Sequence, residues 1–291
     1  MESSPVRNRL MLAAAALLFS TGGAAIKAAT LTGWQVASFR CGGAAIFLLL
    51  ALPEVRRGWQ WRMAPPAVAY AATLVLFVLA NRLTTSANTI FLQSTAPLYL
   101  LLLGPWLLRE PVRRADLLCI AAVAAGMLFI FLGSEQAAAS APDPPRGNLL
   151  ALGAGLAWAF TVTGLRWLGR AGEGNAAIAT VALGNVIGFV IALPMALPVT
   201  AATAANAAVI LYLGVLQIGL AYVFVTRAIR HVPAFEATTV LLLEPAINPL
   251  WAWLVQGERP GTGSLAGGAL ILAATLANTW HHARVPRAAE G

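Results

Sequence analysis

Charged residues are scarce in this chain. They make up 10% of its 291 residues, whereas a soluble domain carries about 25%. Hydrophobic residues make up 59% of the chain, so polar groups could not cover a water-exposed surface. The composition therefore excludes a soluble protein and predicts an integral membrane protein.

Long polar stretches are also missing, which leaves no room for a soluble domain. Runs of about 20 apolar residues can cross a bilayer as helices. Runs such as Leu117–Gly133 lack the strict apolar/polar alternation of a membrane β-barrel. The sequence predicts an all-α integral membrane protein with ten transmembrane helices. The predicted spans are 10–29, 34–52, 64–82, 88–108, 115–133, 147–167, 176–197, 206–228, 236–256 and 263–283.

Residues that carry chemistry are few. Two cysteines, Cys41 and Cys119, fall in predicted spans; we interpret them as small buried apolar residues, not as a disulfide framework. The three histidines, His231, His281 and His282, lie near predicted helix ends. No nucleophile–base, metal-binding or phosphate-binding motif occurs. An enzyme, an ATP-driven pump, a metal and a cofactor are therefore not expected.

Acidic residues are fewer than basic ones, 11 against 19, and the net charge is +8. When the loops are assigned alternately to the two sides of the membrane, four basic residues lie on one side: Lys27, Arg82, Arg146 and Arg259. By the positive-inside rule the other side is cytoplasmic and holds both termini. That basic side is expected to meet anionic lipid, not nucleic acid. It carries Arg7, Arg9, Arg56, Arg57, Arg62, Arg109, Arg113, Arg114, Arg166, Arg170, Arg227, Arg230, Arg284 and Arg287.

The first span admits a second interpretation. Arg7 and Arg9, followed by the apolar run Leu10–Phe19, are similar to a secretory signal peptide. The internal repeat described next includes this span, which argues against its removal.

The two halves of the chain align with each other. Pairing each residue with the one 148 positions later superposes the halves without a gap from Ala80 to Leu128. A slightly smaller offset aligns the first spans of the two halves. The pairs are Pro97 with Pro245, Glu110 with Glu258, Phe19 with Trp158, and Lys27 with Arg166.

Each copy has five predicted spans, which is an odd number. The two copies must therefore have opposite orientations in the membrane, an architecture typical of secondary transporters with a site near the midplane. The predicted domains are a first five-helix repeat at residues 1–133, an external linker at 134–146, and a second, inverted five-helix repeat at 147–291.

The halves share a further pattern. Each has a proline-containing fourth helix that closes in Leu-Arg-Glu (108–110) or Gln-Gly-Glu (256–258), and a last helix rich in small residues. In this the chain resembles the EamA-type branch of the drug/metabolite transporter (DMT) superfamily, and most of all the YddG-type exporters of amino acids. The resemblance implies a bacterial inner-membrane protein, with ten helices around a central cavity and the last helix of each half at the periphery. It implies secondary export of small metabolites, especially amino acids including aromatic ones, by alternating access. We expect a monomer.

Two ionisable residues stand inside predicted spans, where a charge is costly: Glu244 and Arg40. Pro245 and Pro249 each remove a backbone donor, so the ninth span is predicted to be kinked or unwound near Glu244. An amino-acid substrate would bring its ammonium to Glu244 and its carboxylate to Arg40 or Lys27. The candidate substrate-binding residues are Glu244, Asn248, Trp158, Phe19, Gln93, Thr95, Tyr99, Arg40 and Tyr222, with Pro97, Pro245 and Pro249 as structural or gating residues and Asn185 and Gln217 as polar outliers.

Structural roles stay open for several of these residues. Glu244 could bond a neighbouring helix, Arg40 and Lys27 could snorkel to the interface, and Phe19 and Trp158 could be core packing. Glu110 and Glu258 are expected to cap helices or pair with nearby arginines. The spacings Gly184-x-x-x-Gly188 and Gly263-x-x-x-Gly267 predict close helix packing.

Two other functions also stay open. One is export of other small metabolites or drugs by proton antiport. The other is a membrane protein without transport activity, for which an inverted duplication has no evident use.

Overall fold

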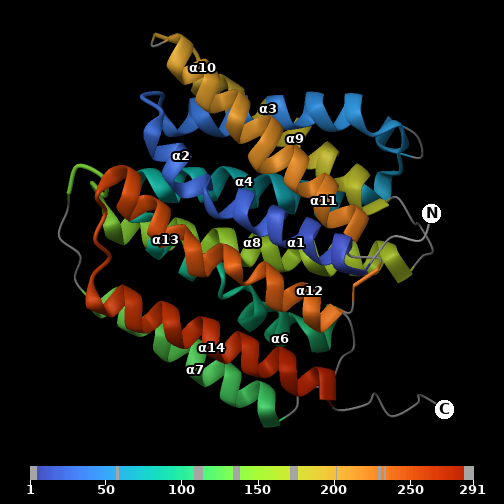
Figure 1. The fold of residues 1–291 in the computed structure, drawn as a ribbon, viewed down its shortest axis with the longest axis vertical. Helices are drawn as coiled ribbons and strands as arrows, with labels where there is room; N and C mark the ends of the chain where they lie inside the picture. Colours follow the sequence, from blue (N-terminus) through green and yellow to red (C-terminus); the bar gives the residue numbers. More distant parts are fainter. Residues whose placement is uncertain are drawn as a thin grey trace.

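The computed structural model of the chain is a bundle of helices (Figure 1). It describes residues 5–56, 59–107, 114–133, 138–170, 176–200, 202–228, 231–232 and 234–284. These ranges contain no β-strand, in agreement with the predicted all-α fold. The α-helices are α1 (Pro5–Ser20), α2 (Gly22–Ala28), α3 (Gly33–Ala51), α4 (Ala64–Leu83), α5 (Ser86–Gln93), α6 (Ala96–Leu107), α7 (Arg114–Leu132), α8 (Pro144–Arg170), α9 (Ala176–Ala196), α10 (Ala204–Leu211), α11 (Ala221–Ala228), α12 (Ala234–Leu241), α13 (Leu243–Gln256) and α14 (Thr262–Arg284).

Six helical stretches of the described chain are long and apolar enough to cross a membrane. The fourth, fifth, ninth and tenth predicted spans are not among them. The fourth and the ninth are each divided between two shorter helices. The ten-span count therefore stays a prediction. The six stretches are Val6–Ala28, Gly33–Ala51, Trp61–Leu83, Pro144–Leu168, Ala176–Ala196 and Ala204–Ala228.

The breaks in the fourth and ninth spans fall at equivalent places in the two halves. Ser94 and Thr95 separate α5 from α6, and Leu242, 148 residues after Ser94, separates α12 from α13. Pro97 is the second residue after the first break, and Pro245 is the third after the other. Proline has no N–H to donate to the carbonyl four residues earlier, so the helical hydrogen-bond ladder is interrupted there. The predicted distortion near Glu244 is confirmed, whereas Pro249 lies inside α13.

Two further irregularities were not predicted. The first span is interrupted at Thr21, between α1 and α2, and the eighth contains a π-helical stretch, η3 (Tyr212–Leu220). The Thr21 hydroxyl donates to Leu18 O at 2.7 Å, which is a local bond that bends helices. It also shares a 2.7 Å hydrogen bond with the hydroxyl of Tyr212, so the two irregular segments touch each other.

Helices α7 and α14, the last of each predicted repeat, lie side by side along one edge of the bundle (Figure 1). They meet at glycines: a Cβ on Gly267 would lie 2.3 Å from Gly126 O, and a Cβ on Gly263 would lie 2.7 Å from Gly133 Cα. Only glycine permits this approach, so the role predicted for Gly263-x-x-x-Gly267 is confirmed.

The spacing Gly184-x-x-x-Gly188 serves the same purpose in α9. A Cβ on Gly184 would lie 2.7 Å from Tyr70 Cδ1 in α4, and one on Gly188 would lie 3.1 Å from Cys41 Sγ in α3. These glycines therefore let α9 pack closely on α3 and α4, which carry Arg40 and Tyr70 of the site described below.

The connections between helices lie at the two ends of the bundle. We call the end that carries residues 29–32, 84–85, 138–143, 197–200 and 257–261 the linker end, and the opposite one, where α1 begins and α14 finishes, the terminal end (Figure 1). At the linker end, side chains bridge neighbouring loops. The bonds include Arg82 Nη2 to Ala29 O (3.0 Å), Gln35 Nε2 to Ala196 O (3.1 Å), and Asn206 Nδ2 to Thr30 Oγ1 (2.8 Å).

Candidate functional site

Four aromatic rings form a chain of contacts through the middle of the described structure. Phe19 of α1 meets Tyr222 of α11 edge to face, with 5.2 Å between ring centroids. Tyr222 meets Tyr70 of α4 at 5.6 Å, and Tyr70 meets Trp158 of α8 at 6.3 Å. These are favourable aromatic geometries. The structure thus brings Phe19 and Trp158 into one cluster, at its two ends and on the first helices of the two halves.

A buried cation lies against this aromatic chain. Arg40, in α3, is 1% exposed and stands close enough to Tyr70 and Tyr222 to interact electrostatically with both. Its Nη2 donates to Leu74 O at 3.2 Å, and its guanidinium carbon lies 6.0 Å from the ring centroid of Phe77. Its Nε has no hydrogen-bond partner within the described chain. Arg40 also interacts with the side chain of its neighbour Cys41. A guanidinium has five N–H donors, and the one on Nε remains without a partner among the described residues. Arg40 is not a snorkelling residue, because its head is buried.

Glu244 lies near the same tyrosine. It stands in the first turn of α13, near enough to Tyr222 to interact electrostatically with it, and it keeps partial exposure. The N-terminus of a helix favours a negative charge. Pro245 and the break at Leu242 create this helix start in mid-span, so the local sequence positions the carboxylate.

Asn248, one turn beyond Glu244, is engaged with α1. Its Nδ2 donates to Ser20 O at 2.9 Å, and Trp251 Nε1 donates to Ser20 Oγ at 3.0 Å. Gln217, in η3, approaches the same turn through a 3.3 Å bond from Nε2 to Phe19 O. Asn248 and Gln217 thus hold α1 at the height of Phe19. Each has a side-chain oxygen without a partner among the described residues.

The remaining predicted residues have local partners. Thr95 is fully buried and donates from Oγ1 to Leu92 O at 2.6 Å. Tyr99 lies beside Thr95, and Gln93 closes α5; both are half-buried. Asn185 donates to Val181 O within its own helix. The structure places Thr95, Tyr99 and Gln93 at the α5–α6 break, without a described contact to the aromatic chain.

Sequence reasoning missed Tyr70, the ring that joins the two halves of the aromatic chain. It is 1% exposed, and its hydroxyl approaches Tyr222 without a hydrogen bond of good geometry. The signal was present, because Tyr70 is a polar-tipped residue in an apolar span, as are Tyr99 and Tyr222. We call Phe19, Arg40, Tyr70, Trp158, Tyr222 and Glu244 the central cluster.

The structure corrects the expected partners of Lys27 and Glu258. Lys27 does not snorkel, because it forms a buried ion pair with Glu258 at the linker end. Glu258 has the expected salt bridge, with Lys27 in place of a nearby arginine, and it also accepts from Ser86 N at the start of α5. The two residues are separated by 231 positions, so no local pattern could reveal the contact. Glu110 lies outside the described residues.

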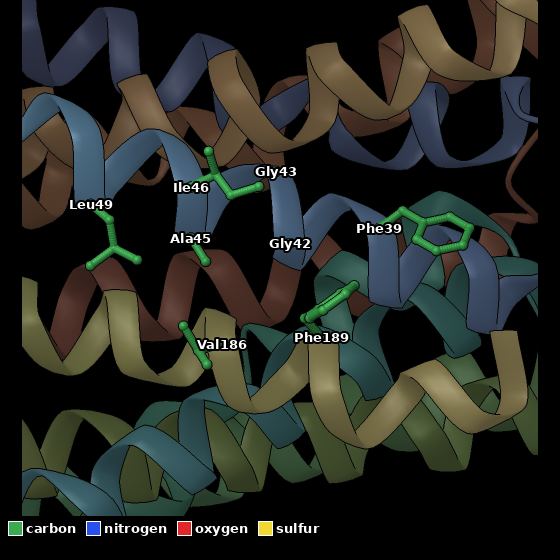
Figure 2. Close-up of a pocket in the computed structure, with 8 residues that line it drawn as sticks. All are labelled: Phe39, Gly42, Gly43, Ala45, Ile46, Leu49, Val186 and Phe189. Carbon is green, nitrogen blue, oxygen red and sulfur yellow. The ribbon is translucent and has the colours of Figure 1, made fainter.

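A hollow of 320 Å³ lies between α3 and α9 and is apolar throughout (Figure 2). Gly42 and Gly43 leave space on α3, and Phe189 and Val186 line it from α9. Since it presents no charged or hydrogen-bonding side chain, it is distinct from the polar site predicted from the sequence.

Comparisons with known proteins give the family. The model of the EamA-like transporter family matches residues 9–132 and 145–280, which together cover most of the chain. This chain belongs to the EamA-like transporter family. The chain is therefore a multi-pass membrane protein of a family of small-molecule transporters, and members of this family are not typically enzymes.

Other comparisons support the fold alone. A protein of known crystal structure, whose title states no function, aligns over 97% of this chain and 100% of its own, with a TM-score of 0.65 and 17% identity. No curated protein matches the chain.

Proposed function

We propose that this EamA-family protein exports amino acids, including aromatic ones, by alternating access around the central cluster. The observation that carries the proposal is a pair of opposite charges close to Tyr222: the buried Arg40 guanidinium, whose Nε has no partner among the described residues, and the Glu244 carboxylate. A free amino acid carries an ammonium group and a carboxylate group on the same carbon atom.

The chemistry of the cluster fits this substrate. The Arg40 fork can hold a carboxylate with two parallel hydrogen bonds, and the Glu244 carboxylate can accept from an ammonium. Rings of Phe19, Tyr222 and Trp158 can contact an aromatic side chain edge to face. Lys27 is excluded as the carboxylate partner because Glu258 already neutralises it.

The proposed arrangement in the membrane follows from the charges. Residues 1–133 and 147–291 would be inverted repeats joined by an external linker at 134–146. The terminal end would face the cytoplasm of a bacterial cell and the linker end the outside. The protein would act as a monomer in contact with lipid. Transport would be secondary, because the sequence has no phosphate-binding loop.

The test is flux through the purified protein in liposomes. Tryptophan and leucine are compared with tryptamine, which lacks the carboxylate, and with indolepropionate, which lacks the ammonium. Wild-type protein should move the amino acids. Arg40→Gln should reduce tryptophan flux by more than about tenfold, since a charge-assisted bidentate pair is lost. Arg227→Gln, an exposed arginine on α11, is the matched control.

Equal tryptophan flux in the Arg40→Gln and Arg227→Gln proteins would rule out Arg40 as the carboxylate site. If no amino acid moves through folded protein, the amino-acid assignment fails and other metabolites become the candidates. A pH gradient that drives flux in wild type but not in Glu244→Gln would favour proton antiport.

A further inference from the structure

The ion pair between Lys27 and Glu258 joins the two predicted repeats at the linker end. Lys27 is in the last turn of α2, and Glu258 follows α13 in the connection to α14. Their side chains are 5% and 1% exposed. Burial this complete is unusual for charged groups, which are almost never fully buried unless paired.

Three further bonds gather the neighbouring loops around the pair. Lys27 Nζ also donates to Thr84 O at 2.8 Å and to Ser140 O. The second carboxylate oxygen of Glu258 accepts from Ser86 N at 3.0 Å, at the start of α5. One ion pair therefore holds α2, the α4–α5 connection, residues 138–143 and the α13–α14 connection in one place.

The pair lies at the outer end of a seam that leads to the central cluster. Along this seam, Gln256 Nε2 donates to Ala24 O at 2.7 Å, and Asn248 and Trp251 bond Ser20 as described. Phe19 is eight residues before Lys27, or roughly 12 Å along a helix that rises 1.5 Å per residue. Anything that passes between the cluster and the linker end along this seam meets the pair.

A buried ion pair can close one end of a transport pathway and still separate readily. Removing two charges from water is costly, and their attraction only offsets that cost, so such a pair adds little net stability over an apolar contact. When the end opens, water solvates both charges and replaces the lost attraction. An apolar seal would instead expose hydrophobic surface on opening.

The counterpart of Lys27 in the second half has different surroundings. Arg166, on which Lys27 falls when the first spans of the two halves are aligned, is exposed. The counterpart of Glu258 is Glu110, which lies outside the described residues. Lys27 is thus buried at a position where its counterpart is exposed.

We propose that Lys27 and Glu258 form a latch that closes the linker end of the transport pathway and separates once in each cycle. The proposal rests on the alternating-access function proposed above and assigns these two residues to gating. The substrate site is elsewhere, at the central cluster.

The test measures access to a thiol beneath the latch, without any substrate. Ser86 is fully buried, and its hydroxyl has no partner among the described residues, so Ser86→Cys is a small change. Its reaction with a charged, membrane-impermeant thiol reagent is followed by mass spectrometry in lipid nanodiscs. Glu258→Gln should raise the rate by about tenfold or more, because the closed state loses its charge pairing.

Two controls decide what a change means. Glu236→Gln breaks the exposed ion pair with Arg9 at the terminal end and should leave the rate unchanged. Cys119, buried in α7, should stay unreactive in every variant, which excludes general unfolding. If Glu258→Gln does not fold, Lys27→Gln with Glu258→Gln removes both charges and should show the same faster labelling.

If the thiol-labelling rate of Ser86→Cys is the same with and without the latch substitutions in folded protein, the latch is overturned and the ion pair is only a static link. Failure of the amino-acid proposal is a separate outcome: faster labelling with no amino-acid flux keeps the latch and removes the substrate assignment. A short thiol crosslinker between Lys27→Cys and Glu258→Cys would hold the linker end closed. It should stop the flux of any transported compound, and flux that continues would contradict the latch.

Discussion

The first and ninth predicted spans are joined by an ion pair at each end, and the two pairs differ in burial. At the terminal end, Arg9 holds Glu236 with two hydrogen bonds, one of them 3.1 Å from Nη2 to Oε2, and the side chains are 55% and 30% exposed. At the linker end, Lys27 and Glu258 are 5% and 1% exposed. The terminal pair has the better fork geometry, yet water and salt screen it. We therefore expect the buried pair to contribute more than the exposed one to keeping its end closed.

The largest change in unfolding free energy is expected when only one partner of the buried ion pair is neutralised. Glu258→Gln leaves the Lys27 charge buried without its partner, and such a loss costs about 3–5 kcal/mol in the closed conformation. Reversible unfolding in mixed detergent micelles measures it, with Glu236→Gln as the matched change at the terminal end. Opening of the linker end would hydrate Lys27 and limit the loss, so unfolding is measured together with Ser86→Cys labelling. Equal losses for the two variants would contradict the comparison.

A smaller effect is expected from overpacking the seam near the latch. A Cβ on Gly23 would lie 2.9 Å from Ser86 Cβ and 3.1 Å from Asn248 Oδ1. Gly23→Ala should therefore lower the unfolding free energy by about 1–3 kcal/mol. Gly153→Ala in α8 is the control, because its nearest neighbour, Leu76 Cδ1, would be at an ordinary 3.4 Å. If both alanines are tolerated equally, the seam is looser than described.

The removal of one hydrogen bond of the seam should cost about 1 kcal/mol. Trp251→Phe keeps the aromatic ring and loses the Nε1 bond to Ser20 Oγ. Trp253→Phe, at a position 50% exposed on the same helix, should cost less. The same unfolding assay compares them, and a larger loss at 253 would show that the Ser20 bond contributes nothing.

The smallest effect concerns salt. Double-mutant cycles on each ion pair at low and high ionic strength should show that the coupling of Arg9 with Glu236 fades while that of Lys27 with Glu258 persists, since salt screens exposed pairs far more than buried ones. A buried pair whose coupling also fades would have to be open to water.

Local chemistry allowed part of the fold to be predicted. Proline has no backbone donor wherever it occurs, so the distortion beside Pro245 was visible in the sequence. Glycine spacing likewise gave the close contacts of α9 and α14. The break at Thr21 and the π-helical stretch Tyr212–Leu220 gave no such signal; the bond between Thr21 and Tyr212 that joins them links residues remote in the sequence.

For the site, the sequence determined which residues are anomalous: a carboxylate and a guanidinium in apolar spans, aromatics at matched positions, and a repeat that implies two orientations. Desolvation makes such residues costly in any membrane fold, so they can be recognised without a structure. Only the tertiary structure decided their partners. It placed Arg40 against Tyr70 and Tyr222, engaged Asn248 with Ser20, and brought Lys27 to Glu258. Pairing depends on distances between helices remote in the chain, and those distances follow from the packing of the whole bundle.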